Sequence, residues 1–333
     1  MGILKKIVYY LIILLITALI IIGLLSLVYD LKYWYSKVLD FPRLQYLILG
    51  FILMFIWFLI NRKWNLPTIL LTLGLISTII IQSFHILPYY VGEKKVHQAN
   101  RTEINEPDVV SILIANVLID NHSAEKFIDI VDKHQPDLLL AMEVDQWWIE
   151  HLKPLKKDYP YLVEYPLSNA YGIALYSKLA LTDKEIRFLN KKDVPSIFAQ
   201  VKLPSNKIFS FYGVHPVAPV PSSKYPDNEG EEEVELIRIG KIVEKDPLPA
   251  IVAGDFNDVS WSNTGRMFED HSQLKNVRLG RGLFNSFNSK SMIMRWPLDH
   301  FFVSPEFSVV QFERLGKFNS DHFPLFAEFL LDQ

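Results

Sequence analysis

Residues 250–262 read AIVAGDFNDVSWS, and this stretch decides the fold class. The small and apolar run Ala250–Ala253 predicts a buried strand, and Gly254 permits a tight turn where that strand ends. Asp255 and Asn257 follow one residue apart, so their side chains point the same way from an extended chain. A buried strand that ends in polar side chains is typical of α/β folds, which bind ligands at strand ends.

The same pattern recurs on either side of this stretch. Strand-like apolar runs lie at 109–114, 138–142, 172–176, 197–203, 208–214, 301–303 and 325–330, with helical patterns at 123–133 and 231–243. The alternation of strand and helix over about 220 residues predicts one large α/β (α+β) domain at residues 109–333.

Polar residues stand at the ends of several of these strands. They are Asn116, Glu143, His215 and Asp255 after a strand, and Asp299 and Asp321-His322 before one. If these ends meet at one edge of a sheet, they form a ligand site. Taken singly, each has a plainer interpretation, because Asp and Asn after a strand commonly stabilise turns and a lone His is commonly structural.

The N-terminal part is uniformly apolar. Ile7–Tyr29, Leu44–Ile60 and Trp64–Gly92 contain no Asp, Glu, Lys or Arg. A helix of about 20 apolar residues crosses a bilayer core of about 30 Å, and runs this long are unusual for buried helices of a soluble protein. We therefore expect a transmembrane anchor at residues 1–92, with spans at about 7–29, 44–60 and 66–87, and a polar linker at 93–108.

Charge separates the two parts. Half of the chain is apolar and 21% is charged, which excludes a disordered protein. Residues 1–90 contain seven Lys/Arg and two Asp/Glu, a net charge of +5, whereas residues 91–333 contain 27 and 35, a net charge of −8.

The basic residues also bear on topology. Lys5, Lys6 and Arg62-Lys63 predict a cytoplasmic N-terminus, and three spans then place the domain outside the cytoplasm of a cell membrane. Bases expected on the outer side, among them Lys37 and Lys94, weaken this bias. The absence of cysteine supplies no disulfide evidence for either compartment.

Together the motifs resemble the endonuclease/exonuclease/phosphatase superfamily, in particular its membrane-anchored bacterial branch. In chain order they are Ala115-Asn116-Val117, Glu143, Gly172–Ser177, Val214-His215-Pro216, Gly254–Asn257, Leu298-Asp299-His300 and Ser320-Asp321-His322. The resemblance covers about residues 109–330. It implies a DNase I-like four-layer α/β sandwich, preceded here by three transmembrane helices in a bacterial inner or cell membrane.

The resemblance also implies a metal site. Glu143 would hold a divalent cation, with Asn116 and Asp321 near it. Oxygen ligands of this kind suit Mg²⁺, or Mn²⁺ in its place, and the absence of cysteine argues against a thiolate zinc site.

The remaining motif residues take catalytic roles by the same resemblance. Asp299 would hydrogen-bond His322, and Asp255 would accept a proton from the attacking water, with His322 as the alternative base. Asn257 would orient Asp255 and donate to a phosphate oxygen, and His215 would stabilise the transition state or protonate the leaving group. The reaction would be hydrolysis of a phosphoester by water.

Three functions follow from these features. The domain is acidic, and its run of Asp227, Glu229 and Glu231–Glu233 is either an ordinary helix start or a lid that repels polyanions. We therefore favour a phosphodiesterase that acts on a lipid head group or small phosphoester. A metal-dependent endo- or exonuclease is the alternative, since nucleic acid is also a phosphodiester. A non-catalytic membrane receptor or scaffold that retains the fold is the third. The oligomeric state stays open.

Two apolar stretches have two interpretations each. Met292–Pro297 precedes Asp299, and Trp147-Trp148 follows Glu143. Either stretch packs in the core, as Met and Trp commonly do, or forms a rim that faces the bilayer beside residues 1–92.

Overall fold

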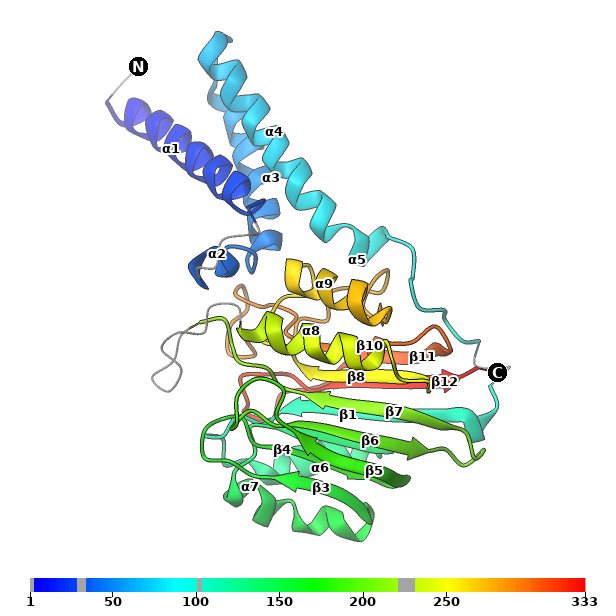
Figure 1. The fold of residues 1–333 in the computed structure, drawn as a ribbon. Coiled ribbons are helices and arrows are strands. Elements are labelled where there is room, and N and C mark those ends of the chain that lie inside the picture. The colour runs from blue at the N-terminus through cyan, green and yellow to red at the C-terminus, as the bar shows by residue number, and fades with distance from the viewer. Residues whose placement is uncertain (1–2, 29–33, 101–103, 221–230, 333) are drawn as a thin grey trace.

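The computed structural model describes residues 3–28, 34–100, 104–220 and 231–332, and Figure 1 shows their arrangement. Three N-terminal helices are long and apolar enough to cross a membrane: α1 (Ile3–Leu25), α3 (Arg43–Ile60) and α4 (Leu66–Ile86). The helix α1 begins and ends about four residues before the predicted span, whose last residue, Tyr29, lies outside the described residues. The other two coincide with their predicted spans within one residue.

These three helices form a helical bundle, and the short helices α2 (Trp34–Val38) and α5 (Pro88–Val91) lie at the end of the bundle nearest the rest of the chain (Figure 1). Ile16, Trp57 and Leu75 are buried between the helices, whereas most other apolar side chains face outward. An apolar exterior around a small packed interior is the pattern expected of helices surrounded by lipid.

The rest of the molecule is built on two six-stranded sheets with helices packed on them, and we call it the α/β domain. The first sheet has the order β11-β12-β1-β2-β4-β3, and the second has the order β5-β6-β7-β8-β10-β9. The strands are β1 (Val109–Asn116), β2 (Leu138–Met142), β3 (Tyr161–Tyr165), β4 (Ile173–Ser177), β5 (Ala180–Arg187), β6 (Ser196–Lys202), β7 (Ile208–Val214), β8 (Ala250–Asp255), β9 (Lys275–Asn276), β10 (Asp299–Val303), β11 (Phe307–Arg314) and β12 (Leu325–Leu331).

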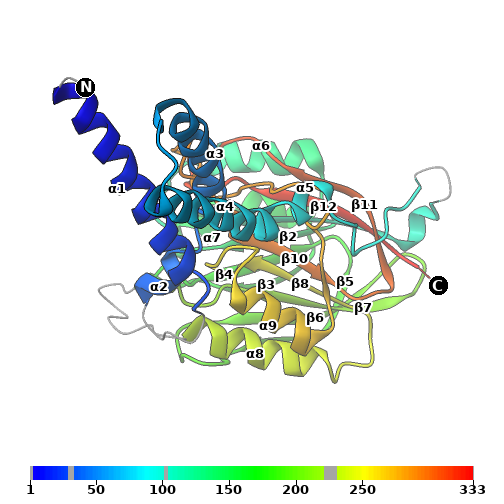
Figure 2. The ribbon, with the colours of Figure 1, turned by 90° about the horizontal axis from the view of Figure 1, so that it is seen from above.

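Helices cover the outer face of each sheet and complete four layers (Figures 1 and 2). The first sheet carries α6 (Ala124–His134) and α7 (Gln146–His151), and the second carries α8 (Glu231–Val243) and α9 (Asn263–Ser272). Strand β1 shows why the layers form, because Ile112 and Ile114 face the other sheet while Leu113 and Ala115 face the helices. The architecture is the predicted DNase I-like four-layer sandwich.

The two sheets bring the same ends of their central strands together. Strand β1 is parallel to β2 in one sheet, and β7 is parallel to β8 in the other. The carboxyl ends of these four strands, together with the amino ends of the antiparallel β10 and β12, therefore meet at one end of the sandwich.

The helical bundle packs directly on the α/β domain. Leu47, Ile86 and Tyr89 of the helical part form one buried cluster with Trp261 and Leu298, among others. The indole Nε1 of Trp261 also donates a 2.7 Å hydrogen bond to the carbonyl oxygen of Asp40.

The described part of the predicted linker lies against the domain as well. Gln98 pairs with Val309 of β11, and Val96 is buried in the core between the sheets. Residues 101–103 of this linker lie outside the described residues.

Candidate active site

All of the polar strand-end residues predicted from the sequence lie at the end of the sandwich where the carboxyl ends of β1, β2, β7 and β8 meet. Asn116 ends β1, Glu143 follows β2, His215 follows β7 and Asp255 ends β8. The first residue of β10, Asp299, is the cross-strand partner of Asp255 in the ladder between β8 and β10.

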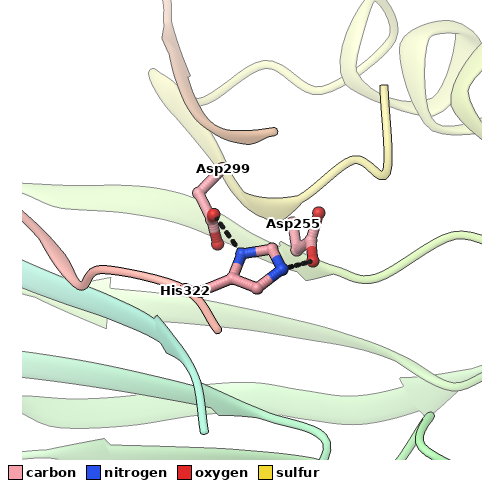
Figure 3. A group of neighbouring side chains, drawn as sticks. All are labelled: Asp255, Asp299 and His322. Atoms are coloured by element: carbon pink, nitrogen blue, oxygen red, sulfur yellow. Dashed lines mark hydrogen bonds and ion pairs between the residues drawn. The ribbon is translucent and has the colours of Figure 1, made fainter. Parts of the chain in front are cut away.

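His322 lies between these two aspartates (Figure 3). Its Nδ1 is 2.7 Å from Oδ2 of Asp299, and its Nε2 is 3.5 Å from Oδ2 of Asp255. All three side chains are buried. Each ring nitrogen of the imidazole therefore faces a carboxylate, an arrangement that fixes the ring orientation and favours the doubly protonated form.

The three groups shift one another's acidity. Burial lowers the pKa of His322, but the charges of Asp299 and Asp255 outweigh it and raise the pKa above its usual value. Burial raises the pKa of Asp299, but the charge and hydrogen bond of His322 hold it below the usual range. Burial raises the pKa of Asp255 despite the charge of His322. Asp299 is thus the anionic partner of His322, and Asp255 is the more basic of the two carboxylates.

The turn after β8 holds Asp255 in place. The backbone N–H of Asn257 donates to Oδ1 of Asp255 at 2.8 Å, and the Asn257 side chain donates to the carbonyl of Pro216 at 2.9 Å. The main chain of Asn257 therefore orients Asp255, and its side chain ties this turn to the loop that carries His215.

His215 is buried and lies near the same oxygen of Asp255 that His322 faces. Its Nε2 is 3.8 Å from Oδ2 of Asp255, and its ring lies 5.3 Å from the ring of Tyr171. Burial, reinforced by the charge of His322, lowers the pKa of His215 to about 3. The imidazole is accordingly neutral near pH 7 and offers one N–H as a hydrogen-bond donor.

Asn116 joins this cluster to Glu143. Its amide nitrogen donates to Oε1 of Glu143 at 2.8 Å and to Oδ2 of Asp255 at 3.1 Å. The second oxygen of Glu143 accepts from the backbone N–H of Ile119 at 3.2 Å. The serine before Asp321, Ser320, donates to the carbonyl of Asn116 at 2.7 Å and so ties the last loop to β1.

The acidic residues here fit a divalent cation. Burial raises the pKa of Glu143; the hydrogen bond from Asn116 and the charge of His322 offset part of this rise, and the negative charge of Asp321 adds to it. In the described part of the chain, no Lys or Arg lies within ion-pair distance of Glu143. A bound divalent cation would offset the cost of burying this carboxylate, and oxygen ligands suit Mg²⁺ or Mn²⁺.

A second group also has metal-like spacing. Asp255, Asp299 and His322 each offer a ligand atom, and these atoms lie within 4.8 Å of one another. The hydrogen bond between His322 and Asp299 occupies Nδ1, however, and a protonated imidazole cannot coordinate a metal through either nitrogen. The chemistry of the donors therefore favours Glu143, with Asn116 and Asp321 beside it.

An aromatic contact to His322 was not predicted from the sequence. The ring of Phe287 lies 5.0 Å from the ring of His322, and Phe287 stacks in turn on Trp296 at 6.1 Å. No pattern around Phe287 distinguishes it from a core residue, because the preceding segment 280–286 forms no regular strand or helix.

The two apolar stretches have different positions. Trp148 is fully buried in the core beneath α7, whereas Trp147 is half-buried and stacks on His151. Met292–Met294 is exposed. Of the acidic segment, Asp227 and Glu229 lie outside the described residues, as do the side chains of Glu231–Glu233.

Comparison with known proteins supports the same family. The model of the endonuclease/exonuclease/phosphatase family matches residues 113–322. No curated protein matches the chain.

Several solved structures share the fold. D. rerio TDP2 complexed with single-strand DNA product is 18% identical with a TM-score of 0.56, covering 66% of this chain and 98% of its own. The human Nocturnin catalytic domain with bound sulfate is 17% identical with a TM-score of 0.55, covering 70% and 98%. A mannosyl-6-phosphatase of Bacteroides thetaiotaomicron is 19% identical with a TM-score of 0.50, covering 66% and 99%.

Members of the endonuclease/exonuclease/phosphatase superfamily are generally phosphoester hydrolases, and they typically depend on divalent metals. The family match spans most of the α/β domain and includes every strand-end residue discussed above. This chain therefore belongs to the endonuclease/exonuclease/phosphatase family.

Proposed function

We propose that this protein is a membrane-anchored, divalent-metal-dependent phosphodiesterase that acts on a lipid head group or a small phosphoester. The observation that carries the proposal is the buried arrangement of Asp299, His322 and Asp255 beside Asn116 and Glu143. Such an arrangement holds a base, an oriented imidazole and a metal-binding carboxylate around one point.

Asp255 is the proposed general base. Its raised pKa makes it the better proton acceptor of the two aspartates, and it faces both histidines. Asp299 keeps His322 oriented and charged, so that His322 stabilises the negative charge that develops on the phosphoryl oxygens. A divalent cation held by Glu143, Asn116 and Asp321 would act as a Lewis acid on the same oxygens.

His215 and Asn257 complete the proposed site. The neutral His215 donates a hydrogen bond to the phosphoryl group or to the leaving oxygen. Asn257 hydrogen-bonds both Asp255 and the loop after His215, so it maintains the distance between Asp255 and His215. Water then displaces the leaving group, one P–O bond forms as another breaks, and Asp255 takes the proton of the water.

The hydrolase proposal is tested with full-length protein in nanodiscs. We expect hydrolysis of bis(p-nitrophenyl) phosphate with Mg²⁺ or Mn²⁺ and none with excess EDTA. Glu143→Gln and Asp255→Ala should each lower the rate by at least about 10²-fold, the usual contribution of a positioned catalytic group. Glu125→Gln, a substitution of an exposed acid on α6, is the control. Rates for Glu143→Gln and Glu125→Gln that are both no higher than the uncatalysed rate would instead favour a non-catalytic receptor or scaffold.

A nuclease is the second candidate, and one observation favours it. Arg295, Arg314 and Lys317 surround the ring of Phe323, the residue after His322, at 5.1, 4.3 and 5.7 Å. Positive charge beside the site restores some of the phosphate affinity that the acidic domain lacks. Comparing hydrolysis of single-stranded DNA with that of phospholipids in the same preparation decides between the two substrates.

We also propose the topology predicted from the sequence, with residues 1–92 as anchor, 93–108 as linker and the domain at 109–333 outside the cytoplasm of a bacterial cell membrane. Lys5 and Arg62 line one cavity at the bundle end far from the domain, as cytoplasmic bases should. At the other end Arg43 pairs with Asp40 at 2.7 Å, so it adds no net charge there. Alkaline phosphatase fused to the C-terminus should be active, and an inactive fusion would contradict this topology.

A further inference from the structure

Three consecutive apolar side chains project from the loop that precedes β10. Met292, Ile293 and Met294 are 89%, 74% and 47% exposed, and we call them the apolar tip. The loop is held at its base, where the backbone N–H of Phe287 donates to the carbonyl of Trp296 at 2.9 Å. Exposed apolar residues gathered at one place mark an interaction site more often than single ones do.

The apolar tip lies where a membrane span begins. Gln45, in the first turn of α3, donates from Nε2 to the carbonyl of Ile293 at 2.7 Å. At the base of the loop, the ring of Trp296 lies 5.6 Å from the ring of Phe41, just before the same helix. Figure 1 shows α1 and α3 ending above this side of the α/β domain. If α3 spans the bilayer, the apolar tip is therefore at the level of the leaflet nearest the domain.

Positive charge adjoins the apolar tip. Arg295, the residue after it, belongs to the basic cluster with Arg314 and Lys317 around Phe323. Burial lowers the pKa of Arg314, and the charge of Arg295 lowers it further, so the cations crowd one another. Within residues 231–332, no carboxylate lies at ion-pair distance from any of the three. The basic cluster can therefore bind an anionic group of another molecule.

We propose that the apolar tip inserts into the bilayer leaflet facing the domain and that the basic cluster binds the head groups of anionic phospholipids there. Apolar side chains beside Lys and Arg are the combination that binds anionic membrane surfaces. A nucleic acid is the weaker fit, because Met and Ile offer no aromatic face on which bases stack. The proposal does not depend on hydrolysis, since the contact holds the domain on the membrane whatever its substrate.

Site-specific labelling tests the insertion, and the absence of cysteine makes it direct. Ile293→Cys in the full-length chain is labelled with an environment-sensitive fluorophore and reconstituted into phosphatidylcholine/phosphatidylglycerol nanodiscs. The matched control is Ile208→Cys, whose side chain is 37% exposed at the start of β7. Lipids with a doxyl quencher in their chains should quench the label at position 293 and leave the label at position 208 unchanged. Equal quenching at the two positions would overturn the proposal.

The charge preference is tested in the same samples. Doxyl-phosphatidylglycerol should quench the label at position 293 more than doxyl-phosphatidylcholine does at the same mole fraction. Lys317→Gln should reduce that preference by up to about fivefold, the enrichment that one cation gives at an anionic surface. The absence of a preference for doxyl-phosphatidylglycerol would refute binding of anionic lipid. A preference that single-stranded DNA changes but Lys317→Gln does not would refute it as well. The readout is not activity, so an inactive enzyme leaves this test intact.

Discussion

Gly254 allows the two strands that carry His215 and Asp255 to approach each other, and its replacement gives a stringent test of the site. The residue has a φ of +147°, which L side chains rarely adopt. A Cβ atom added there would lie 1.9 Å from the carbonyl oxygen of Val214, whereas the shortest ordinary van der Waals contact of a Cβ atom is 3.4 Å. In Gly254→Ala the backbones of β7 and β8 must therefore separate by about 1.5 Å locally, the difference between these two distances.

The cost follows from these two effects. Forcing a methyl group into a packed site costs about 1–3 kcal/mol, and a non-glycine residue in a disfavoured backbone region costs about 1–3 kcal/mol more. The sum, about 2–6 kcal/mol, corresponds to a lower melting temperature by at least about 4 °C for a domain of this size. Because Val214 and Gly254 directly precede His215 and Asp255, the same movement separates these side chains. A displacement of about 1 Å at a reacting centre lowers the rate about 10²-fold.

Gly316→Ala is the matched control, since no heavy atom lies within 4 Å of a Cβ added at Gly316. Both variants are made in the full-length chain and compared by thermal unfolding and by hydrolysis of bis(p-nitrophenyl) phosphate. If Gly254→Ala melts and hydrolyses like Gly316→Ala, the close approach of β7 and β8 is not what positions the site.

Three further predictions test other contacts. Asp299→Asn should lower kcat of phosphodiester hydrolysis at least about 10²-fold because His322 loses its anionic partner, and a rate near that of the unsubstituted protein would contradict this role. Trp148→Ala should cost about 3–5 kcal/mol of unfolding free energy, while Trp147→Ala should cost far less; equal losses in denaturant titrations would disprove the assigned burial. Trp261→Phe should cost about 1–3 kcal/mol by leaving the Asp40 carbonyl unpaired, and an unchanged melting temperature would show that this hydrogen bond is dispensable.

The strands that were predicted correctly are those with buried side chains on both faces. In β2 and β8 every residue is buried, so a continuous apolar run shows in the sequence. Strand β5 escaped prediction because most of its residues are half-buried or exposed and several are charged. Helix α9 was also missed, although the side chain of Ser262 caps it by accepting from the Gly265 N–H at 3.0 Å. A polar segment rich in turn-forming residues hides such a helix.

The sequence predicted which polar residues gather at this end of the sandwich and, through the family resemblance, the hydrogen bond between Asp299 and His322, but not the other pairings. That Asp255 and Asp299 end up as cross-strand neighbours depends on the register of β8 and β10, which no local pattern encodes. Asn257 binds Asp255 through its backbone N–H and Pro216 through its side chain. These two separate contacts could be seen only in the folded turn. The burial of the site residues also could not be predicted from the sequence.

The contacts between the helical bundle and the candidate site bear on how the protein is assembled. An unbroken series of aromatic rings runs from Phe41, before α3, through Trp296 and Phe287 to His322. The carboxylates of Asp299 and Asp255 orient His322, and this series of rings adds packing against its imidazole from the side of the helices. A domain cut from its helices would expose Trp296 on this face and lose that support. The helical bundle therefore contributes to the packing around His322, in addition to its proposed role as the attachment to the membrane.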